Sequence, residues 1–311
     1  MIVVGGEALV DLVDDRGSRR AVAGGGPFNT AVALGRLDVP VAFLGAVSRD
    51  AYGEILTQLL IDAGVDTSLE RRSDLPTPQA TVHRADDGRN SYTFSLVATA
   101  FTDFPAELLP PLPESAWAIH VGTLGLAVDP PAGTYEALLH REAGRRRIIL
   151  DPNVRPASFG SADVYRWRFE RLARLADVVK LSDDDAAWIY PMLPVADVLE
   201  TILGFGPRLV ALTCGARGAI ARSGTDIVDV PGIPVHVADT VGAGDSFGAA
   251  LVAALVDERV LGPRLDCELD EACLRRAVTY AVAASAVTCT RTGAVPPSRE
   301  EIDALLAARA R

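Results

Sequence analysis

The stretch Asp239-Thr240-Val241-Gly242-Ala243-Gly244-Asp245-Ser246-Phe247 leads directly into an apolar run that ends at Leu255. Small residues, an aspartate and then a run of helical periodicity predict a tight loop that passes straight into a helix. A helix N-terminus exposes unpaired backbone N–H groups and partial positive charge, so the backbone of Gly242, Ala243 and Gly244 can wrap around an anion such as phosphate. Asp245 would then stand beside the phosphate, where it can take a proton from an attacking hydroxyl. The alternative is that Asp245 only stabilises the start of the helix while the glycines turn the chain.

Short β-rich runs alternate with amphipathic segments of helical length along most of the chain. The expected buried strands are residues 2–4, 41–44, 117–121, 147–150, 177–181 and 209–213. The expected helices are residues 29–37, 52–63, 132–143, 165–176 and 195–203. This alternation predicts an α/β fold in which helices cover both faces of a mainly parallel sheet, with ligands outside the carboxyl ends of the strands.

Two pairs of extended segments interrupt this alternation. Residues 81–85 and 90–97 alternate around Asp86-Asp87-Gly88, which predicts a β-hairpin. Residues 8–13 and 19–23 also have an extended pattern without a helix between them. Because parallel strands need a long crossover, these segments predict a small separate sheet. We expect it to form a lid over the site, built from about residues 8–23 and 78–100 of a single domain that spans residues 1–311.

Composition excludes several kinds of partner and site. A formal net charge of −11 argues against a nucleic-acid or anionic-membrane partner. Lys180 is the only lysine among the 30 basic residues, so no Gly-Lys-Ser/Thr occurs and a Walker-type phosphate loop is excluded. The four cysteines, Cys214, Cys267, Cys273 and Cys289, lack metal-ligand spacing and are expected to be free thiols. The chain begins with an expected strand and has no apolar stretch long enough to span a bilayer, so we expect a soluble, cytoplasmic protein.

The N-terminal region carries a second group of residues suited to a polar ligand. In Gly24-Gly25-Gly26-Pro27-Phe28-Asn29 the glycines let a ligand approach the backbone, and the Asn29 amide can donate to and accept from a sugar hydroxyl. Asp11 lies where the first strand is expected to close, and its carboxylate can accept from two adjacent hydroxyls. An ordinary loop with Asn29 as helix N-cap, and a solvated strand end at Asp11, are the alternatives.

These segments together resemble the ribokinase-like (pfkB) family of carbohydrate kinases, through the whole chain and most closely its fructokinase-type members. The resemblance implies a three-layer sandwich with a mainly parallel central sheet, helices on both faces and a small β-sheet lid. The residues that match the family's sugar site are Asp11, Gly24, Gly25 and Asn29. Those that match its anion hole and catalytic base are Gly242, Ala243, Gly244 and Asp245.

Two motifs in the middle of the chain sharpen this resemblance. Asp151-Pro152-Asn153-Val154-Arg155-Pro156 is similar to the Asp-Pro-Asn-x-Arg run of fructokinase-type members. It implies that Asn153 contacts the sugar and that the guanidinium of Arg155 lies near the transferred phosphate; a surface arginine is the alternative. Thr213-Cys214-Gly215-Ala216-Arg217-Gly218 resembles the family's nucleotide loop, for which a simple β-turn is the alternative. The residues expected to bind the nucleotide are Lys180, Ser182, Thr213, Gly215, Gly218, Gly242 and Gly244.

Metal sites are implied by resemblance alone. Lys180-Leu181-Ser182-Asp183-Asp184-Asp185 takes the place of the family's Asn-x-x-Glu, which organises the water shell of Mg²⁺ and phosphate. Here it reads Ser182-x-x-Asp185, so Asp185 is expected to serve through water, although Asp183 and Asp184 stay open as alternatives. Asp239 and the carbonyl of Val241 would contribute to a K⁺ site. Asp38 and Ser48 depart from the family signature, which usually has glycine at both places.

The resemblance implies phosphoryl transfer from MgATP to a primary hydroxyl of a monosaccharide, most similar to fructokinases that form fructose 6-phosphate. Ribose, tagatose, adenosine and 2-keto-3-deoxygluconate stay open as acceptors, and Arg84 and Arg89 in the lid could contact a sugar acid. A catalytically silent sugar-binding regulator is a rival, which the intact Asp245 argues against. A nicotinamide-dependent oxidoreductase is set aside because Gly-x-Gly-x-x-Gly does not follow the first strand. The exposed edges of a small sheet predict a homodimer through the lids.

Overall fold

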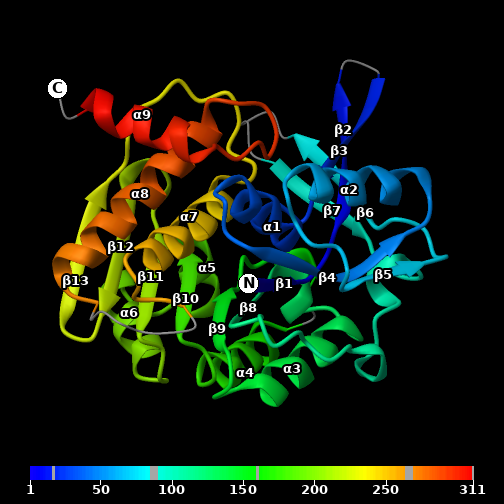
Figure 1. The fold of residues 1–311 in the computed structure, drawn as a ribbon, viewed down its shortest axis with the longest axis horizontal. Helices are drawn as coiled ribbons and strands as arrows, with labels where there is room; N and C mark the ends of the chain where they lie inside the picture. The colour runs from blue at the N-terminus through cyan, green and yellow to red at the C-terminus, as the bar shows by residue number, and fades with distance from the viewer. Residues whose placement is uncertain (16–17, 85–89, 159–160, 263–268, 310–311) are drawn as a thin grey trace.

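A nine-stranded sheet runs through the middle of the molecule (Figure 1). The structure, a computed structural model, describes residues 1–15, 18–84, 90–158, 161–262 and 269–309. The strand order is β13 (Asp226–Pro231), β12 (Gly218–Ser223), β11 (Leu209–Thr213), β10 (Val178–Ser182), β9 (Arg147–Asp151), β8 (Ala118–Gly122), β1 (Ile2–Gly5), β4 (Val41–Ser48) and β5 (Glu70–Ser73). Neighbouring strands are parallel from β11 through to β5, whereas β12 and β13 are antiparallel. Because the order reverses at β1, the carboxyl ends of β1 and its neighbours form the expected place for a ligand.

Helices cover both faces of this sheet, as the alternation predicted. One buried cluster joins the sheet to α1 (Gly26–Arg36), α2 (Ala51–Asp62), α7 (Ala243–Asp257), α8 (Glu271–Cys289) and α9 (Arg299–Arg309). A second cluster joins the other face to α3 (Pro131–Glu142), α4 (Ala162–Ala173), α5 (Asp183–Ile189) and α6 (Val195–Leu203). In β1, Ile2 and Val4 pack in the first cluster and Val3 in the second. The strand is therefore apolar throughout because successive side chains face opposite, equally buried layers.

Short 3₁₀ turns complete the connections. They are η1 (Ala100–Thr102), η2 (Ala106–Leu108), η3 (Thr123–Leu126), η4 (Pro156–Ser158) and η5 (Gly215–Arg217). Of these, η3 follows β8 and η5 follows β11, so both lie at carboxyl ends of parallel strands. They leave the chain near the place where a ligand is expected.

A second, four-stranded sheet projects beside the main one, in the order β3 (Ser18–Gly24), β2 (Leu9–Asp15), β6 (Gln79–Arg84) and β7 (Asn90–Ser95) (Figure 1). The β6–β7 pair is antiparallel, as the hairpin pattern predicted, and β2 pairs antiparallel with β3 and parallel with β6. The predicted turn Asp86-Asp87-Gly88 lies outside the described residues. The small sheet is therefore present, and the three-layer α/β architecture is confirmed.

Three local expectations were wrong. The first helix begins at Gly26 and not at Asn29, because Pro27 is suited to the first helical turn and Gly25 supplies the turn with a φ of 107°. Asn29 is therefore inside the helix and not its N-cap. Asp11 does not close the first strand: β1 ends at Gly5, and Asp11 lies within β2 of the small sheet. The extended segment after Asn90 ends at Ser95, before η1 packs against β4.

Several elements carry no clear signal in the sequence. These are β5, β12, β13, α5, α8 and α9. The longest of them, α8, is capped by the Asp270 carboxylate, which accepts from the Cys273 amide at 2.7 Å. It is rich in alanine and buried on the side that faces α7, so polar–apolar periodicity is weak along its length.

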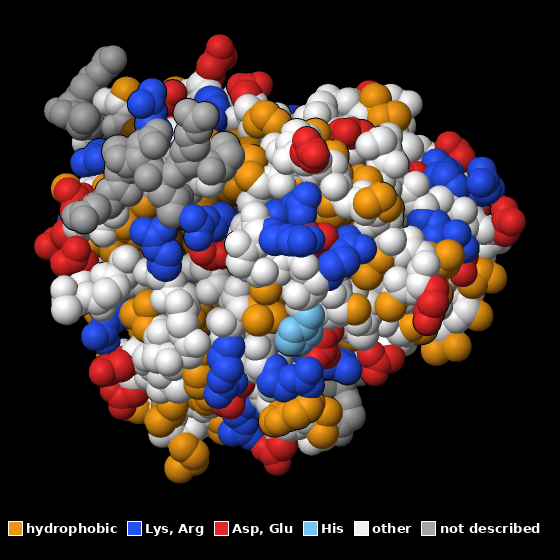
Figure 2. Space-filling view, turned by 60° about the horizontal axis from the view of Figure 1, so that its bottom comes forward, with side chains coloured by type: hydrophobic (Ala, Val, Ile, Leu, Met, Phe, Trp, Pro, Cys, Tyr) orange, Lys and Arg blue, Asp and Glu red, His pale blue; other side chains and the backbone are white. Residues whose placement is uncertain are grey.

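The described residues also allow the expectations about membrane spans, surface charge and cysteines to be compared with the structure. None of their helices has the length and apolar character required to cross a membrane. On the side of the molecule that carries α3 and α4, basic and acidic side chains are interspersed (Figure 2). Cys214 and Cys273 are free and buried and Cys289 is free and half-buried, whereas Cys267 lies outside the described residues.

Candidate active site

The quoted loop does pass directly into a helix. Gly242 has a φ of 75° and caps α7, which begins at Ala243 and carries Gly244 and Asp245 in its first turn. A Cβ on Gly242 would lie 2.6 Å from the Cβ of Ala294, so both the backbone conformation and the space require glycine. The backbone N–H groups at this helix start can donate hydrogen bonds to a bound anion.

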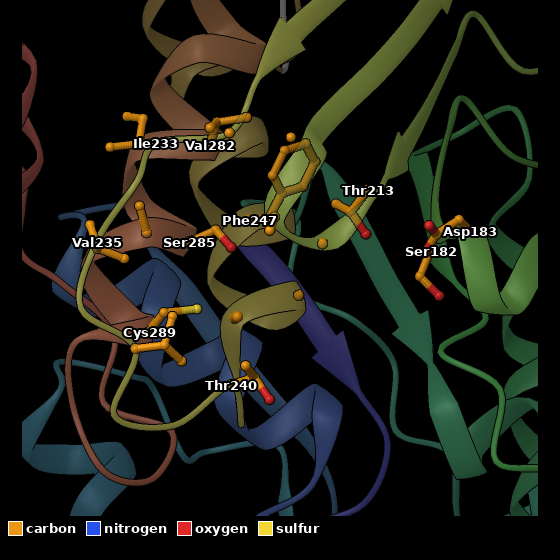
Figure 3. Close-up of a pocket in the computed structure, with 18 of the residues that line it drawn as sticks. Ser182, Asp183, Thr213, Ile233, Val235, Thr240, Phe247, Val282, Ser285 and Cys289 are labelled. Atoms are coloured by element: carbon orange, nitrogen blue, oxygen red, sulfur yellow. The ribbon is translucent and has the colours of Figure 1, made fainter. Parts of the chain in front are cut away.

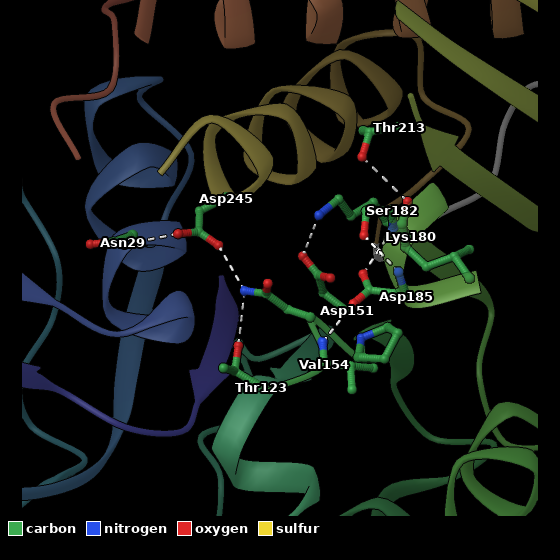
Figure 4. Close-up of polar contacts among 12 residues, drawn as sticks. Asn29, Thr123, Asp151, Val154, Lys180, Ser182, Asp185, Thr213 and Asp245 are labelled. Carbon is green, nitrogen blue, oxygen red and sulfur yellow. Dashed lines mark hydrogen bonds and ion pairs between the residues drawn. The ribbon is translucent and has the colours of Figure 1, made fainter. Parts of the chain in front are cut away.

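Asp245 is held in place by two amides that come from distant parts of the chain. Asn29 Nδ2 donates to Asp245 Oδ2 at 2.8 Å across 216 positions of sequence, and Asn153 Nδ2 donates to Oδ1 at 3.4 Å (Figure 4). The pKa of Asp245 is raised to about 6, mainly by burial. The hydrogen bond from Asn29 opposes this rise, the Asp151 carboxylate adds to it, and the positive charges of Lys180 and Arg155 oppose it. Near pH 7 this carboxylate is ionised, oriented and able to accept a proton.

Lys180 places a buried positive charge beside the start of α7. Its Nζ lies 2.9 Å from Asp151 Oδ2, and both side chains are about 95% buried or more. Burial alone would lower the pKa of Lys180, but Asp151 and Asp185 outweigh it and raise the pKa above its ordinary value. A Cβ on Gly244 would lie 3.1 Å from Nζ. The ammonium therefore lies next to the backbone of the predicted anion hole.

The predicted sugar-binding residues gather on the other side of Asp245. Asp11 reaches this region from β2, and a Cβ on Gly24 of β3 would lie 2.5 Å from Asp11 Oδ2. Burial raises the pKa of Asp11 to about 6; Arg155 lowers it, and Asp245 and Asp239 raise it. The structure thus brings Asp11 close to the other residues predicted to bind the sugar, although its strand was predicted wrongly.

The backbone of Gly26 lies close to the side chains of Thr123 and Asn153 in this region. A Cβ on Gly26 would lie 2.3 Å from Thr123 Oγ1 and 2.9 Å from Asn153 Nδ2. Thr123 and Asn153 themselves have positive φ angles of 51° and 36°, and Asn153 Nδ2 donates to Thr123 Oγ1 at 3.2 Å. Backbone strain of this kind costs on the order of 1–3 kcal/mol and is found where a site imposes a geometry. Sequence reasoning missed Thr123 because nothing in its neighbourhood distinguishes it from an ordinary strand end.

Arg155 lies in the same region, with its guanidinium folded onto its own loop. Its Nη1 donates to Asn153 Oδ1 at 2.8 Å and to the carbonyls of Asn153 and Val154 at 3.2 Å. Its charge lowers the pKa of Glu7, Asp11 and Asp245. Contact between Arg155 and a transferred phosphate stays a prediction.

A pocket of about 650 Å³ opens on the opposite side of the anion hole (Figure 3). Six of the seven residues predicted to bind the nucleotide line it: Lys180, Ser182, Thr213, Gly215, Gly218 and Gly244. The seventh, Gly242, is not among the lining residues. The apolar end of the pocket is formed by Ile233, Val235, Val282 and Cys289, with the Ser285 hydroxyl among them. Gly218 has a φ of 105°, and a Cβ there would lie 2.0 Å from the Val230 carbonyl oxygen, which explains the glycine at this turn.

The three consecutive aspartates have different surroundings. Asp185 is buried and accepts from the Val154 amide at 2.6 Å and from the Ser182 amide at 2.8 Å, and the second bond forms a capping box with the N-cap Ser182 at the start of α5. Burial and then Asp151 raise its pKa, whereas Lys180 and Ser182 lower it. Asp183 pairs with Arg217 at 2.9 Å, and Asp184 is exposed. No group of three or more acidic, histidine or cysteine side chains able to hold a metal occurs in the described part of the chain. One carboxylate beside the pocket predicted to bind the nucleotide would fit Mg²⁺ held mainly by phosphate oxygens and water.

The predicted K⁺ residues border the anion hole on the side of α8. Asp239 accepts from the Val241 amide at 3.2 Å and from the Gly293 amide at 2.9 Å. Its own amide donates to the Cys289 carbonyl at 3.3 Å. These bonds hold the loop before α7 against the segment after α8.

Two buried titratable groups near the site were not assigned a role from the sequence. Glu7 is 1% exposed and lies beside residues 24–26. His120 in β8 is buried, and burial followed by the Lys180 charge lowers its pKa to about 4, so it is neutral. A charged residue inside the otherwise apolar segment 2–10 was the available signal for Glu7.

Comparison with known proteins agrees with this geometry. The sequence pattern of the pfkB family carbohydrate kinases matches residues 1–301. A fructokinase of Rhizobium leguminosarum bv. trifolii is 39% identical over 282 residues, which cover 88% of this chain and 86% of that protein. The crystal structure of fructokinase from Vibrio cholerae O395 with fructose, ADP and calcium has a TM-score of 0.86 at 28% identity, covering 98% of both chains. Fructokinase from Xylella fastidiosa with bound ATP has a TM-score of 0.89 at 26% identity, covering 100% of this chain and 99% of that one. The resemblance seen in the sequence is confirmed: this chain belongs to the pfkB family of carbohydrate kinases.

Proposed function

We propose that this protein is an ATP-dependent fructokinase that converts fructose to fructose 6-phosphate. The observation that carries the proposal is the position of Asp245. Its carboxylate, oriented by Asn29, stands between the predicted sugar residues and the first amides of α7. The structures of relatives with fructose and ADP, and with ATP, support these two substrates.

In the proposed reaction, an Asp245 carboxylate oxygen takes the proton of the sugar's primary hydroxyl as that oxygen attacks the γ-phosphorus. The bond from the γ-phosphorus to the bridging oxygen breaks, and ADP leaves with the electron pair. The amides at residues 242–245, Lys180 and Arg155 stabilise the negative charge on the transferred group, which is the main contribution a protein makes to phosphoryl transfer. When bound with the nucleotide, Mg²⁺ neutralises phosphate charge, and Asp185 would hold it through water.

The charges around the sugar region favour a neutral acceptor. Asp11 and Asp245 bring two carboxylates to this side of the predicted anion hole, and Arg155 brings one positive charge. A sugar acid would add a further carboxylate to this group. Arg84 and Arg89 were named as residues that could contact a sugar acid, but the side chain of Arg84 and all of Arg89 lie outside what the structure describes.

ADP formation measured across fructose, ribose, tagatose, 2-keto-3-deoxygluconate and adenosine, each with and without K⁺, tests the acceptor. We expect the highest kcat/KM with fructose and a gain with K⁺, since Asp239 and Val241 border the anion hole. A higher kcat/KM with another acceptor would replace fructose in the proposal.

Asp245→Asn tests the catalytic base and the rival of a silent sugar-binding protein. We expect kcat to fall by about 10²–10⁴-fold while fructose binding, measured by calorimetry, is retained. Asp62→Asn, an exposed carboxylate on α2, is the matched control and should leave kcat unchanged. Unchanged turnover in Asp245→Asn would remove the assignment of the base.

We further propose that the small sheet acts as a lid and joins two copies of the chain in a cytoplasmic homodimer. Asp11 extends from this sheet into the site, and Val13 on β2 and Val97 after β7 are exposed apolar side chains. The edges of an open sheet favour pairing with another chain. A monomer at micromolar concentration in light scattering would contradict the dimer.

A further inference from the structure

The main chain passes between the small sheet and the main α/β layers at two neighbouring points beside the proposed active site. One crossing runs from the end of β1 at Gly5 to the start of β2 at Leu9. The other runs from the end of β3 at Gly24 to the start of α1 at Gly26. The two crossings are adjacent because Leu9 and Gly24 are paired in the β2–β3 ladder.

Glu7 connects these two crossings. Its Oε1 accepts from the Gly26 amide at 3.2 Å, which is one of the unpaired N–H groups at the start of α1. A Cβ on Gly25 would lie 2.6 Å from the Glu7 carbonyl oxygen and 3.3 Å from its Cγ, so the second crossing rests directly on Glu7. The side chain is 1% exposed, and Oε2 has no hydrogen-bond partner among the described residues.

Hydrogen bonds lead from this contact to the proposed base. The Asn29 amide donates to the Gly25 carbonyl at 2.8 Å, and the Asn29 side chain donates to Asp245 at 2.8 Å. A shift of residues 24–26 would therefore move Asn29 and, with it, the carboxylate that faces the sugar. Glu7 does not line the nucleotide pocket, and it reaches the proposed sugar site only through the backbone of Gly25 and Gly26.

The groups around Glu7 favour its neutral form. The pKa of Glu7 is raised to about 8, mainly by burial. Its own backbone N–H, the Arg155 charge and the Gly26 amide oppose this rise, and the Asp245 carboxylate adds to it. The charged and titratable groups that face it from neighbouring elements are Arg155 after β9, Asp245 on α7 and Tyr135 on α3, and Glu7 helps burial to raise the pKa of Tyr135. Only one of these groups is a cation, and it also interacts with Asp11 and Asp245.

We propose that Glu7 is a positioning residue that acts as a neutral carboxylic acid, joins these two crossings and thereby holds residues 24–26 and Asn29 against Asp245. This inference rests on the proposed sugar kinase function. It assigns Glu7 a role in sugar affinity and in the alkaline limit of activity, without placing it among the groups that touch substrate.

Glu7→Gln and Glu7→Ala separate the parts of this proposal. Glutamine keeps the shape, the acceptor for the Gly26 amide and a permanently neutral group, whereas alanine leaves that amide unpaired and opens a void. At pH 7 we expect Glu7→Gln to match wild type within about threefold in kcat and in KM for fructose. We expect Glu7→Ala to raise the KM for fructose by about tenfold or more, with little change in the KM for ATP.

The pH dependence gives a readout that a purely structural contact would not move. In wild type, kcat/KM for fructose should fall as Glu7 ionises above about pH 8, because the buried charge disturbs residues 24–26 and Asp245. In Glu7→Gln this fall should be absent.

The pH dependence of unfolding gives a second readout. Native Glu7 holds its proton to about pH 8, whereas the unfolded chain releases it near 4.5, so this group makes wild type lose stability as the pH rises between those values. The melting temperature of Glu7→Gln relative to wild type should therefore rise from pH 5 to pH 8.

Glu142→Gln is the matched control, because Glu142, the last residue of α3, is also buried but pairs with Arg141 of that helix and with Arg146 after it. It should lower the melting temperature without changing the KM for fructose. The proposal is overturned if Glu7→Gln loses more than 100-fold in kcat/KM at pH 7, if a folded Glu7→Ala keeps the wild-type KM, or if the alkaline fall persists in Glu7→Gln. Should wild type phosphorylate no sugar, the proposed function fails, while the melting temperatures still decide whether Glu7 is neutral.

Discussion

Replacement of Lys180 tests the charge arrangement beneath the anion hole. Its Nζ lies 2.9 Å from Asp151 Oδ2 inside the molecule, and Asp151 Oδ1 has no partner among the described residues. Lys180→Met keeps the length of the side chain and removes the charge, so the Asp151 carboxylate is left buried and unpaired. Lys180→Arg keeps the charge but needs more room, and a Cβ on Gly244 would already lie 3.1 Å from Nζ.

The structure allows the size of these effects to be worked out. Removing one member of a buried ion pair destabilises a protein by about 3–5 kcal/mol, because the remaining charge is uncompensated. With an unfolding entropy of about 2.1 cal/mol/K per residue, this chain would melt about 5–8 °C lower. Because the ammonium adjoins the amides that would receive the phosphate, we expect kcat to fall by about 10²–10³-fold, as for the loss of one oxyanion-stabilising group.

The assay combines calorimetric unfolding with steady-state ADP formation in four proteins: wild type, Lys180→Met, Lys180→Arg and the double variant Lys180→Met/Asp151→Asn. The double variant removes both charges, so it should recover most of the lost stability and none of the lost turnover. Lys180→Arg should not restore kcat to within tenfold of wild type. If Lys180→Met keeps kcat within about threefold of wild type, or if Asp151→Asn fails to recover stability in the double variant, the reasoning about this pair is refuted.

Three further predictions concern backbone conformation and the nucleotide pocket. Gly242→Ala should lower kcat by at least about 10²-fold in steady-state assays. Position 242 has a positive φ, and the new Cβ would lie 2.6 Å from the Cβ of Ala294, so the backbone of the predicted anion hole must move. An unchanged kcat would contradict this. With saturating fructose, GTP and ITP should support kcat/KM within about 100-fold of ATP, because an apolar pocket end discriminates weakly, whereas discrimination above 1,000-fold would show that buried polar groups read the base. Asp38→Gly should change the unfolding free energy in urea by less than about 1 kcal/mol and leave kcat unaltered, because relief of a φ of 55° is offset by the greater freedom of glycine when unfolded.

Much of the fold could be predicted because the decisive signals are local. The six expected strands all appear in the main sheet, and the hairpin pattern gave the β6–β7 pair, since alternation and turn residues act over a few positions. The antiparallel strands β12 and β13 and the helix α8 were missed, because burial against other elements removes the periodicity by which an element is recognised in the sequence. Asp11 was assigned to the wrong strand for a related reason: residues 2–10, apolar except for Glu7, contain all of β1, the crossing at residues 6–8 and the start of β2.

The site divides in the same way. The glycine and alanine backbone at residues 242–244 and the helix that follows are properties of a few adjacent residues, so the sequence by itself determined a helix start of the kind that suits an anion, with Asp245 in its first turn. Only the tertiary structure decided what surrounds it. Strand order brings Asn29 to Asp245 from 216 positions away and places Lys180 beneath Gly244, and the packing of two chain crossings buries Glu7. Charge and protonation depend on burial and on distances between residues remote in sequence, and those are fixed only when the sheet has assembled.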